Sequence, residues 1–264
     1  FIKMIEDTTL EDDDSEGWAK YTLEILGYVP DAVFTSENYG DPYAKFMGSV
    51  HVLVDKARTN IPISATMVRS NPLFYGKFLE PVVRAYFAWR ICIIGAESTG
   101  TTTLAKALAS HYKTVWVPEY GRSYAEGKLT SEEVGWSTEE FIKIAEGQNT
   151  LEDALAEQSN GLVICDTDAF ATSVWHERYM HVRSTNVERI ANMRSHDLYI
   201  VTGDEIPFVQ DGTRDGESIR HWMHERFIER LNEDYKPYIL VTGTPEERVK
   251  AALNAIDQLF TAQP

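Results

Sequence analysis

The sequence predicts an α/β protein whose second part is a parallel β-sheet covered by helices on both faces. Five short apolar runs recur there, each followed by a stretch with helical spacing, at residues 90–95, 113–119, 161–166, 198–203 and 238–243. Continuous apolar strands that alternate with helices are typical of such sheets. A turn rich in glycine and hydroxyl residues, 95–102, directly follows the first run and opens a helix, which is typical of a phosphate-binding loop.

The first part of the chain also alternates predicted helices and strands, in shorter segments. Gly27 and Gly48 each follow a helical pattern as C-terminal caps, Pro72 limits one helix to about two turns, and Pro81 begins another. In chain order we expect a helix at 18–26, a strand at 31–37, a helix at 41–48, a strand at 49–55, a short helix within 62–72 and a helix from residue 81. The pattern of strands and helices changes near residues 87–90, which indicates a domain boundary there. We therefore expect domains at 1–88 and 89–264.

Composition excludes several classes of protein. The 264 residues suit two domains, and no apolar run reaches the length of a membrane span. A formal charge of −16 makes nucleic-acid binding unfavourable. Cys92 and Cys165 each lie in an apolar run, so we expect buried free thiols and a cytoplasmic protein. Residue 1 is Phe and no signal peptide follows, so we expect the natural N-terminus to lie upstream.

The turn after the first strand matches the pattern G-x-x-x-x-G-K-[ST] at all but one position. Gly95 and Gly100 have the required spacing and Thr102 stands at the metal-ligand position, but Thr101 replaces the lysine. Backbone amides still surround an anion, so we expect the triphosphate of ATP to bind here. The expected binding residues are Gly95, Ala96, Glu97, Ser98, Thr99, Gly100, Thr101, Thr102 and Thr103. The alternative is an ordinary strand-to-helix turn capped by threonines.

The missing lysine removes a positive charge that phosphoryl transfer needs in its transition state. Arg214 and Arg220 lie in a glycine-punctuated stretch after the fourth strand of the second part, and we expect them to supply the charge from a lid. The alternative is that these arginines pair with nearby acidic residues on a solvated surface.

Acidic residues follow two of the strands, at the sheet edge where ligands bind. Glu119 is placed to accept a proton from a substrate hydroxyl, or else to pair with Arg122 or to cap a following turn. Asp166 is placed to hold Mg²⁺ together with Thr102 or to contact the substrate, the alternative being an N-cap of the helix that starts near residue 169. Asp168 fits either the same role or an N-cap. The aromatic residues Trp175 and Tyr179 border an acceptor site, or else belong to the core.

Several of these segments together resemble one known family. They are "RICIIGAESTGTTTLAKALASHY", "WVPEYGR", "CDTDAFAT", "WHERYM" and "PFVQDGTRDGESIR", preceded by "VFTSENYGDPYAKFMG", "VLVDKAR" and "ISATMVRSNP". The first set is similar to the ribosylnicotinamide kinase domain of NadR-type bifunctional enzymes. The second is similar to the C-terminal half of their Rossmann-like nicotinamide-mononucleotide adenylyltransferase domain. The resemblance covers about residues 15–255.

The resemblance implies two activities of NAD biosynthesis. The kinase domain would phosphorylate nicotinamide riboside with ATP and Mg²⁺ to give nicotinamide mononucleotide, with Glu119 as the base. The other domain would transfer an adenylyl group to that product to give NAD, with Ser64, Thr66 and Arg69 at the ATP phosphates. The family's H-x-G-H motif is absent from the 264 residues, so residues 1–88 by themselves are expected not to catalyse adenylyl transfer.

Two other functions remain open on the sequence. A nucleotide sensor would bind ATP or NAD at the lysine-free turn without turnover. A transcriptional repressor would need a basic recognition helix, which the sequence does not show. A homo-oligomer is compatible with the sequence, which gives no information on oligomeric state.

Overall fold

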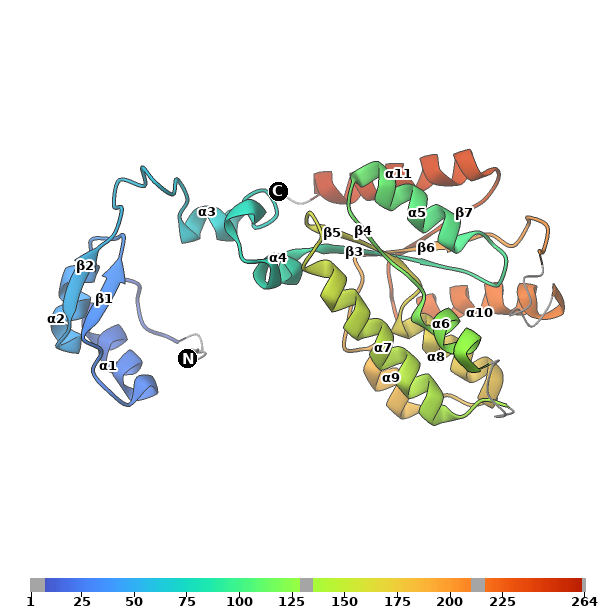
Figure 1. The fold of residues 1–264 in the computed structure, drawn as a ribbon, viewed down its shortest axis with the longest axis horizontal. Helices are drawn as coiled ribbons and strands as arrows, with labels where there is room; N and C mark the ends of the chain where they lie inside the picture. The colour runs from blue at the N-terminus through green and yellow to red at the C-terminus, as the bar shows by residue number, and fades with distance from the viewer. Residues whose placement is uncertain (1–7, 129–134, 210–216, 263–264) are drawn as a thin grey trace. The chain divides into compact units, whose positions relative to one another are not determined.

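A computed structural model of the protein describes residues 8–128, 135–209 and 217–262 (Figure 1). The chain forms two compact units, Phe1–Ser70 and Asn71–Pro264. The elements of the first unit are α1 (Ser15–Leu26), β1 (Ala32–Thr35), α2 (Gly40–Met47), β2 (Val50–Leu53) and α3 (Ala65–Ser70). The second unit begins with a 3-10 turn, η1 (Gly76–Phe78), and the helix α4 (Pro81–Phe87).

The second unit then alternates strands and helices as the sequence predicts. Its elements are β3 (Trp89–Ile94), α5 (Thr101–Tyr112), β4 (Val115–Val117), α6 (Tyr120–Lys128), α7 (Thr138–Ala156), β5 (Leu162–Asp166), α8 (Ala169–Met180), α9 (Thr185–Ala191), β6 (Leu198–Thr202), η2 (Glu217–Ile219), α10 (Arg220–Glu233), β7 (Tyr238–Val241) and α11 (Pro245–Ala262). None of the helices in the described residues is long and apolar enough to cross a membrane.

The first unit is a small parallel pair of strands packed with helices. β1 and β2 pair in register from Ala32 opposite Val50 to Thr35 opposite Leu53. Large apolar side chains of both strands are exposed, with Phe34 at 67% and Val50 at 65%. A sheet normally buries such side chains, so these two strands have the character of part of a larger sheet.

The compact units divide earlier than the boundary near residues 87–90 that the sequence predicts. Residues 71–88 pack with the second unit because α4 contacts the end of α7. Arg84 Nη2 donates to the carbonyl of Glu157 at 3.1 Å, and Ala85 and Ala88 lie in one buried cluster with Ala156. These tertiary contacts leave no mark in composition or spacing.

The five-stranded sheet of the second unit has the order β4-β5-β3-β6-β7, and all its pairs are parallel. Helices α5 and α11 cover one face, and α7, α8 and α10 lie on the other (Figure 1). The α/β class and parallel sheet predicted from the sequence are confirmed. The carboxyl ends of all five strands meet at one edge, where ligands of such sheets bind.

The central strand β3 contributes to two separate cores. Ile91 and Ile93 pack on the side of α5 and α11, while Cys92 and Ile94 pack on the opposite side. Cys92 lies directly across from Cys165 of β5, and both are free and fully buried, as predicted. Burial raises the pKa of both thiols.

A chain of buried polar groups lies behind the sheet. Arg90 Nε donates to Glu152 Oε1 at 2.6 Å, and the other oxygen of Glu152 lies 3.2 Å from His196 Nε2. Burial alone would raise the pKa of Glu152, but His196 and Arg90 outweigh it and hold the pKa at about 2. On the far side of His196, Asp168 accepts a hydrogen bond of 2.7 Å from Tyr199 Oη. Two cations and two carboxylates therefore compensate one another inside the core.

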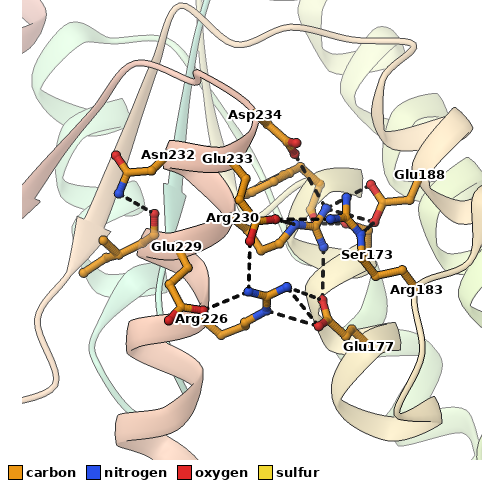
Figure 2. A network of polar contacts seen from close by, with 12 residues as sticks. Ser173, Glu177, Arg183, Glu188, Arg226, Glu229, Arg230, Asn232, Glu233 and Asp234 are labelled. Carbon is orange, nitrogen blue, oxygen red and sulfur yellow. Dashed lines mark hydrogen bonds and ion pairs between the residues drawn. The ribbon is translucent and has the colours of Figure 1, made fainter.

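A second charged cluster joins α8, α9 and α10 (Figure 2). The fully buried Arg230 contacts Glu177 at 3.2 Å and donates to both oxygens of Glu188 at 2.9 Å. Arg226 of the same helix also pairs with Glu177 at 3.0 Å. Because the partners come from three helices, these contacts fix α10 against α8.

We expect Glu152→Gln to destabilise the protein by about 3–5 kcal/mol at pH 7, because Arg90 and His196 would stay buried without the counter-charge that they share. Urea unfolding measures this, with the exposed Glu157→Gln as control. The folded pKa of Glu152 lies below its ordinary value of 4.5, so its stabilising effect is present above that pH and is lost toward about 2. The difference between wild type and variant should therefore shrink over that range, and a difference independent of pH would contradict the prediction.

Candidate functional site

The turn 95–102 joins β3 to α5 in a conformation that glycine permits. Gly100 is the N-cap of α5 with φ of +85°, in the left-handed region, and Ser98 has φ of +60°. The first amides of a helix have no partner inside it and carry the positive end of the helix dipole. The amides of Thr101, Thr102 and Thr103 are therefore available to an anion.

Gly95 is required by close packing at the start of the turn. A Cβ atom there would lie 2.1 Å from Thr202 Oγ1 and 2.7 Å from Thr99 Oγ1. The Thr99 hydroxyl donates to the carbonyl of Ala96 at 2.6 Å and contacts the Thr202 hydroxyl at 2.7 Å. Thr99 thus stabilises the turn from within, whereas the other turn residues expected to bind phosphate line a cavity: Gly95, Ala96, Glu97, Ser98, Gly100, Thr101, Thr102 and Thr103.

Arg248 of α11 holds the outer side of the turn. Its guanidinium is almost fully buried and donates to three backbone carbonyls, those of Thr99 at 2.6 Å, Gly203 at 3.0 Å and Gly243 at 3.1 Å. The turn is therefore tied to the ends of β6 and β7. Sequence reasoning missed Arg248, because an arginine within an amphipathic helix gives no signal that it is buried.

An oxygen pair forms the floor of the cavity. Thr102 Oγ1 donates to Asp166 Oδ2 at 2.5 Å, so the two residues predicted to share a metal ion are in contact. Burial raises the pKa of Asp166, and the hydrogen bonds from Thr102 and Thr101 oppose that rise. Hydroxyl and carboxylate oxygens are the kind of ligand atom that Mg²⁺ prefers, so this pair fits the ion.

Glu119 lines the same cavity from the end of β4. Its side chain is 33% exposed, and Arg122 Nε lies 3.8 Å from Oε2. Glu119 therefore pairs with Arg122 and also faces the cavity, and its role as the base stays a prediction. Loss of hydration and the nearby charges of Asp166 and Glu97 outweigh Arg122 and raise the pKa of Glu119 to about 7. A carboxylate with that pKa can exchange a proton near neutral pH.

Aromatic side chains form the remaining wall of the cavity. Trp175 and Tyr179 of α8 both line it, as do Trp136 and Phe141. The ring centroids of Trp136 and Tyr179 are 5.6 Å apart, and those of Phe141 and Tyr179 are 5.8 Å apart. Sequence reasoning missed Trp136 and Phe141, which precede and begin α7 outside any strand end, and no local pattern marks them.

The other predicted residues have varied positions. Asp168 accepts from the amide of Ala171 at 2.8 Å and so acts as the N-cap of α8, behind the cavity. Arg220 begins α10 and is 5% exposed; its Nη2 donates to the Ser98 carbonyl at 3.4 Å. Arg220 Nε is buried and has no hydrogen-bond partner in the part of the chain that the structure describes. Arg214 lies outside the described residues.

Ser64, Thr66 and Arg69 lie in the first unit. Ser64 Oγ accepts from the amide of Met67 at 3.1 Å and caps α3, a helix of 6 residues on which Thr66 and Arg69 are exposed. The helix predicted there is confirmed, and a role in adenylyl transfer stays a prediction.

A second hollow lies on the other side of the turn. It is shared by α5, the start of α11 and the turn between β7 and α11, and its mostly apolar lining includes Leu104, Ala107, Val249 and Leu253. It is lined by Gly100 and Thr103, which also line the main cavity. A ligand bound by the turn therefore has room on both sides.

Comparison with known proteins gives three findings of similarity. A sequence model of the AAA domain family matches residues 90–248. The trifunctional NAD biosynthesis/regulator protein NadR of Escherichia coli (strain K12) is 31% identical over 230 residues, which are 86% of this chain and 56% of that protein. The protein of the same name from Salmonella typhimurium (strain LT2) is 30% identical over 85% of this chain and 57% of its own length. The chain thus spans little more than half the length of these relatives.

Two crystal structures of NadR proteins share the fold. One, in complex with NR, superposes with a TM-score of 0.71 at 22% identity, over 92% of this chain and 74% of that one. The other, in complex with NAD and AMP-PNP, gives 0.69 at 22% identity, over 96% and 74%. At this identity the likeness concerns the fold alone.

We expect Gly95→Ala to weaken nucleotide binding about tenfold and to lower stability by about 1–3 kcal/mol, because the added Cβ must displace the buried Thr202 hydroxyl. Titration with a fluorescent ATP analogue and thermal unfolding measure the two effects. Gly127→Ala is the matched control, since a Cβ at Gly127 meets no atom within 4 Å. Equal affinity in both variants would show that the turn tolerates a side chain at position 95.

Proposed function

The chain belongs to the AAA domain family, and we propose that its second unit is an ATP-dependent kinase that phosphorylates nicotinamide riboside to nicotinamide mononucleotide. The observation that carries the proposal is the meeting of three chemical parts in one cavity. These are the amide-rich turn 95–102, the oxygen pair of Thr102 and Asp166, and Glu119 with a pKa of about 7. The names and bound molecules of the similar NadR proteins support the choice of substrate.

Each part has a defined task in the proposed reaction. The turn binds the triphosphate of ATP through backbone amides, and the apolar hollow beyond Thr103 accommodates the purine base. Thr102 and Asp166 would hold Mg²⁺, which lowers the negative charge of the phosphates when bound. The aromatic wall suits the flat, cationic nicotinamide ring, because aromatic faces attract cations.

Glu119 acts as the base of the transfer. The 5′-hydroxyl oxygen of the riboside attacks the γ-phosphorus, and its proton passes to a carboxylate oxygen of Glu119. The bond between the γ-phosphorus and the bridging oxygen breaks, and ADP leaves with that oxygen. Because the cavity walls keep the pKa of Glu119 near neutral, the carboxylate is basic enough to take the proton and is still ionised in part at pH 7.

Arginines take the place of the missing lysine in this proposal. Arg220 reaches the turn at the Ser98 carbonyl, and its buried Nε has no hydrogen-bond partner among the described residues; Arg122 lines the cavity beside Glu119. Their guanidinium groups would stabilise the charge that develops on the phosphoryl oxygens. Arg220 belongs to a helix fixed by Arg230, so its charge is positioned before the nucleotide binds.

For the first unit we propose a place in a nucleotidylyltransferase-like domain. The parallel strands with exposed apolar side chains and the hydroxyl-capped helix carrying Arg69 support this. The complete domain would transfer an adenylyl group from ATP to nicotinamide mononucleotide and release NAD. The 264 residues lack the H-x-G-H motif, so the proposal concerns a protein that also carries that motif.

The alternative is a nucleotide sensor that binds ATP or NAD without turnover, favoured by the threonine at position 101. Incubation with nicotinamide riboside, ATP and Mg²⁺, followed by chromatography, distinguishes the two. Nicotinamide mononucleotide and ADP in equal amounts support the kinase, whereas tight nucleotide binding without product supports the sensor.

We expect Glu119→Gln to lower kcat by about 100-fold or more while the affinity for ATP stays nearly unchanged. Since the base must be deprotonated in the free enzyme, kcat/KM of the wild type should rise with pH through about 7 and then level off. This limb should be absent in the variant. The exposed Glu126→Gln serves as control, and wild-type turnover in Glu119→Gln would remove Glu119 as the base.

We expect Arg220→Ala to lower kcat by about 10- to 100-fold with a smaller change in KM for ATP, because its charge acts on the transition state. Steady-state kinetics at several ATP concentrations measure both constants. Arg189→Ala on α9, an exposed arginine, should behave as wild type. A raised KM at unaltered kcat would instead make Arg220 a ligand of the ground state.

A further inference from the structure

Gln148 is a buried polar residue that the proposed reaction does not yet use. It lies in the middle of α7 with 1% of its side chain exposed. A buried amide requires hydrogen-bond partners, since its transfer from water is otherwise unfavourable. The partners of Gln148 all belong to the backbone at the edge of the sheet where the cavity lies.

The contacts of Gln148 join two chain segments that carry the proposed chemistry. Oε1 accepts from the amide of Tyr120 at 2.8 Å, and Nε2 lies 3.4 Å from the Pro118 carbonyl and 3.4 Å from the Thr167 carbonyl. Glu119 is thus held at the peptide groups on both sides of it. Residue 167, held by the same amide, directly follows Asp166.

No strand pairing connects the two segments at this point. The register of β4 and β5 ends with Val117 opposite Cys165, one residue before Asp166. Beyond that pair, the Gln148 side chain provides the described link between the backbone at Glu119 and the backbone after Asp166. The amide side chain of Gln148 therefore joins the two segments beyond the point where their strands stop pairing.

The packing around Gln148 favours a specific distance between α7 and the sheet edge. A Cβ at the neighbouring Gly147 would lie 2.4 Å from the Tyr120 ring, so this glycine lets the helix approach closely. Thr167 has φ of +69°, a strained conformation for a β-branched residue, and its amide donates to the Ile93 carbonyl at 2.9 Å. Such strain persists only where neighbouring contacts hold it.

We propose that Gln148 is a positioning residue that sets the separation of the Glu119 and Asp166 carboxylates. The inference rests on the proposed kinase function, because that separation decides whether an acceptor hydroxyl reaches Glu119 while the phosphates occupy the turn. A misplacement of about 1 Å can lower the rate of such a reaction about 100-fold. The hydrogen bonds described for Gln148 are to backbone groups, so it acts through Glu119 and Asp166.

The variant Gln148→Met tests the proposal, because methionine has a similar volume and lacks the amide. Without the link, the two carboxylates should separate and water should enter between them. We expect kcat to fall about 10- to 100-fold, KM for ATP to change less than about twofold, and the acid limb of kcat/KM to move to lower pH. Gln148→Asn keeps the amide on a shorter arm and should show a smaller fall. Gln158→Met, at an exposed glutamine, is the control.

A second measurement separates this inference from the proposed function. Carbon NMR titration of the Glu119 carboxyl reports its pKa in wild type and Gln148→Met without any substrate. A lower pKa in the variant supports positioning even if the wild type forms no product, in which case the kinase proposal alone fails. An unchanged pKa in folded Gln148→Met, or Gln148→Asn if the first variant does not fold, overturns the inference. If the wild type is active, a kcat of Gln148→Met equal to that of the wild type also overturns the inference.

Discussion

The site depends on the parallel pairing of β3 with β5, which places Ile93 opposite Asp166. This register brings the start of α5 level with the end of β5, so the Thr102 hydroxyl meets the Asp166 carboxylate at 2.5 Å. A shift of one residue would turn the alternating side chains of β5 to the opposite faces and remove the carboxylate from the turn. The two cores on either side of β3 oppose such a shift, because Ile91 and Ile93 belong to one core and Cys92 and Ile94 to the other.

Buried polar side chains fix the positions of the turns and helices that strand pairing alone does not determine. Arg248 ties the turn 95–102 to the ends of β6 and β7, and Gln148 joins the backbone around Glu119 to that after Asp166. The cluster around Arg230 fixes the helix that begins with Arg220 against the helix that carries Trp175 and Tyr179 (Figure 2). In each of these contacts, a charged or amide side chain forms hydrogen bonds with backbone groups or with a carboxylate. Such hydrogen bonds are directional and so fix the geometry of the groups that they join. This edge of the sheet is thus held by side chains that do not line the main cavity.

The sequence predicts the strands and the turn well because their signals are local. Apolar runs, the spacing of Gly95 and Gly100, and acidic residues at strand ends are visible within a few residues. Gln148, Glu152 and Arg248 escape such reasoning because a polar residue in a helix normally faces water, and their burial comes from tertiary contact. The same limit explains why residues 71–88 could not be assigned to the second unit, and why the two roles open to Asp168 could be separated only in the folded protein.

The paired cysteines of the central strands have a practical consequence. Cys92 and Cys165 face each other across β3 and β5, fully enclosed, and their raised pKa values keep the thiols protonated. An alkylating reagent reacts with an accessible thiolate, and neither condition is met while the sheet is intact. The rate of labelling by iodoacetamide therefore reports how often the innermost strands open. The native cysteines allow this motion to be measured without an added probe.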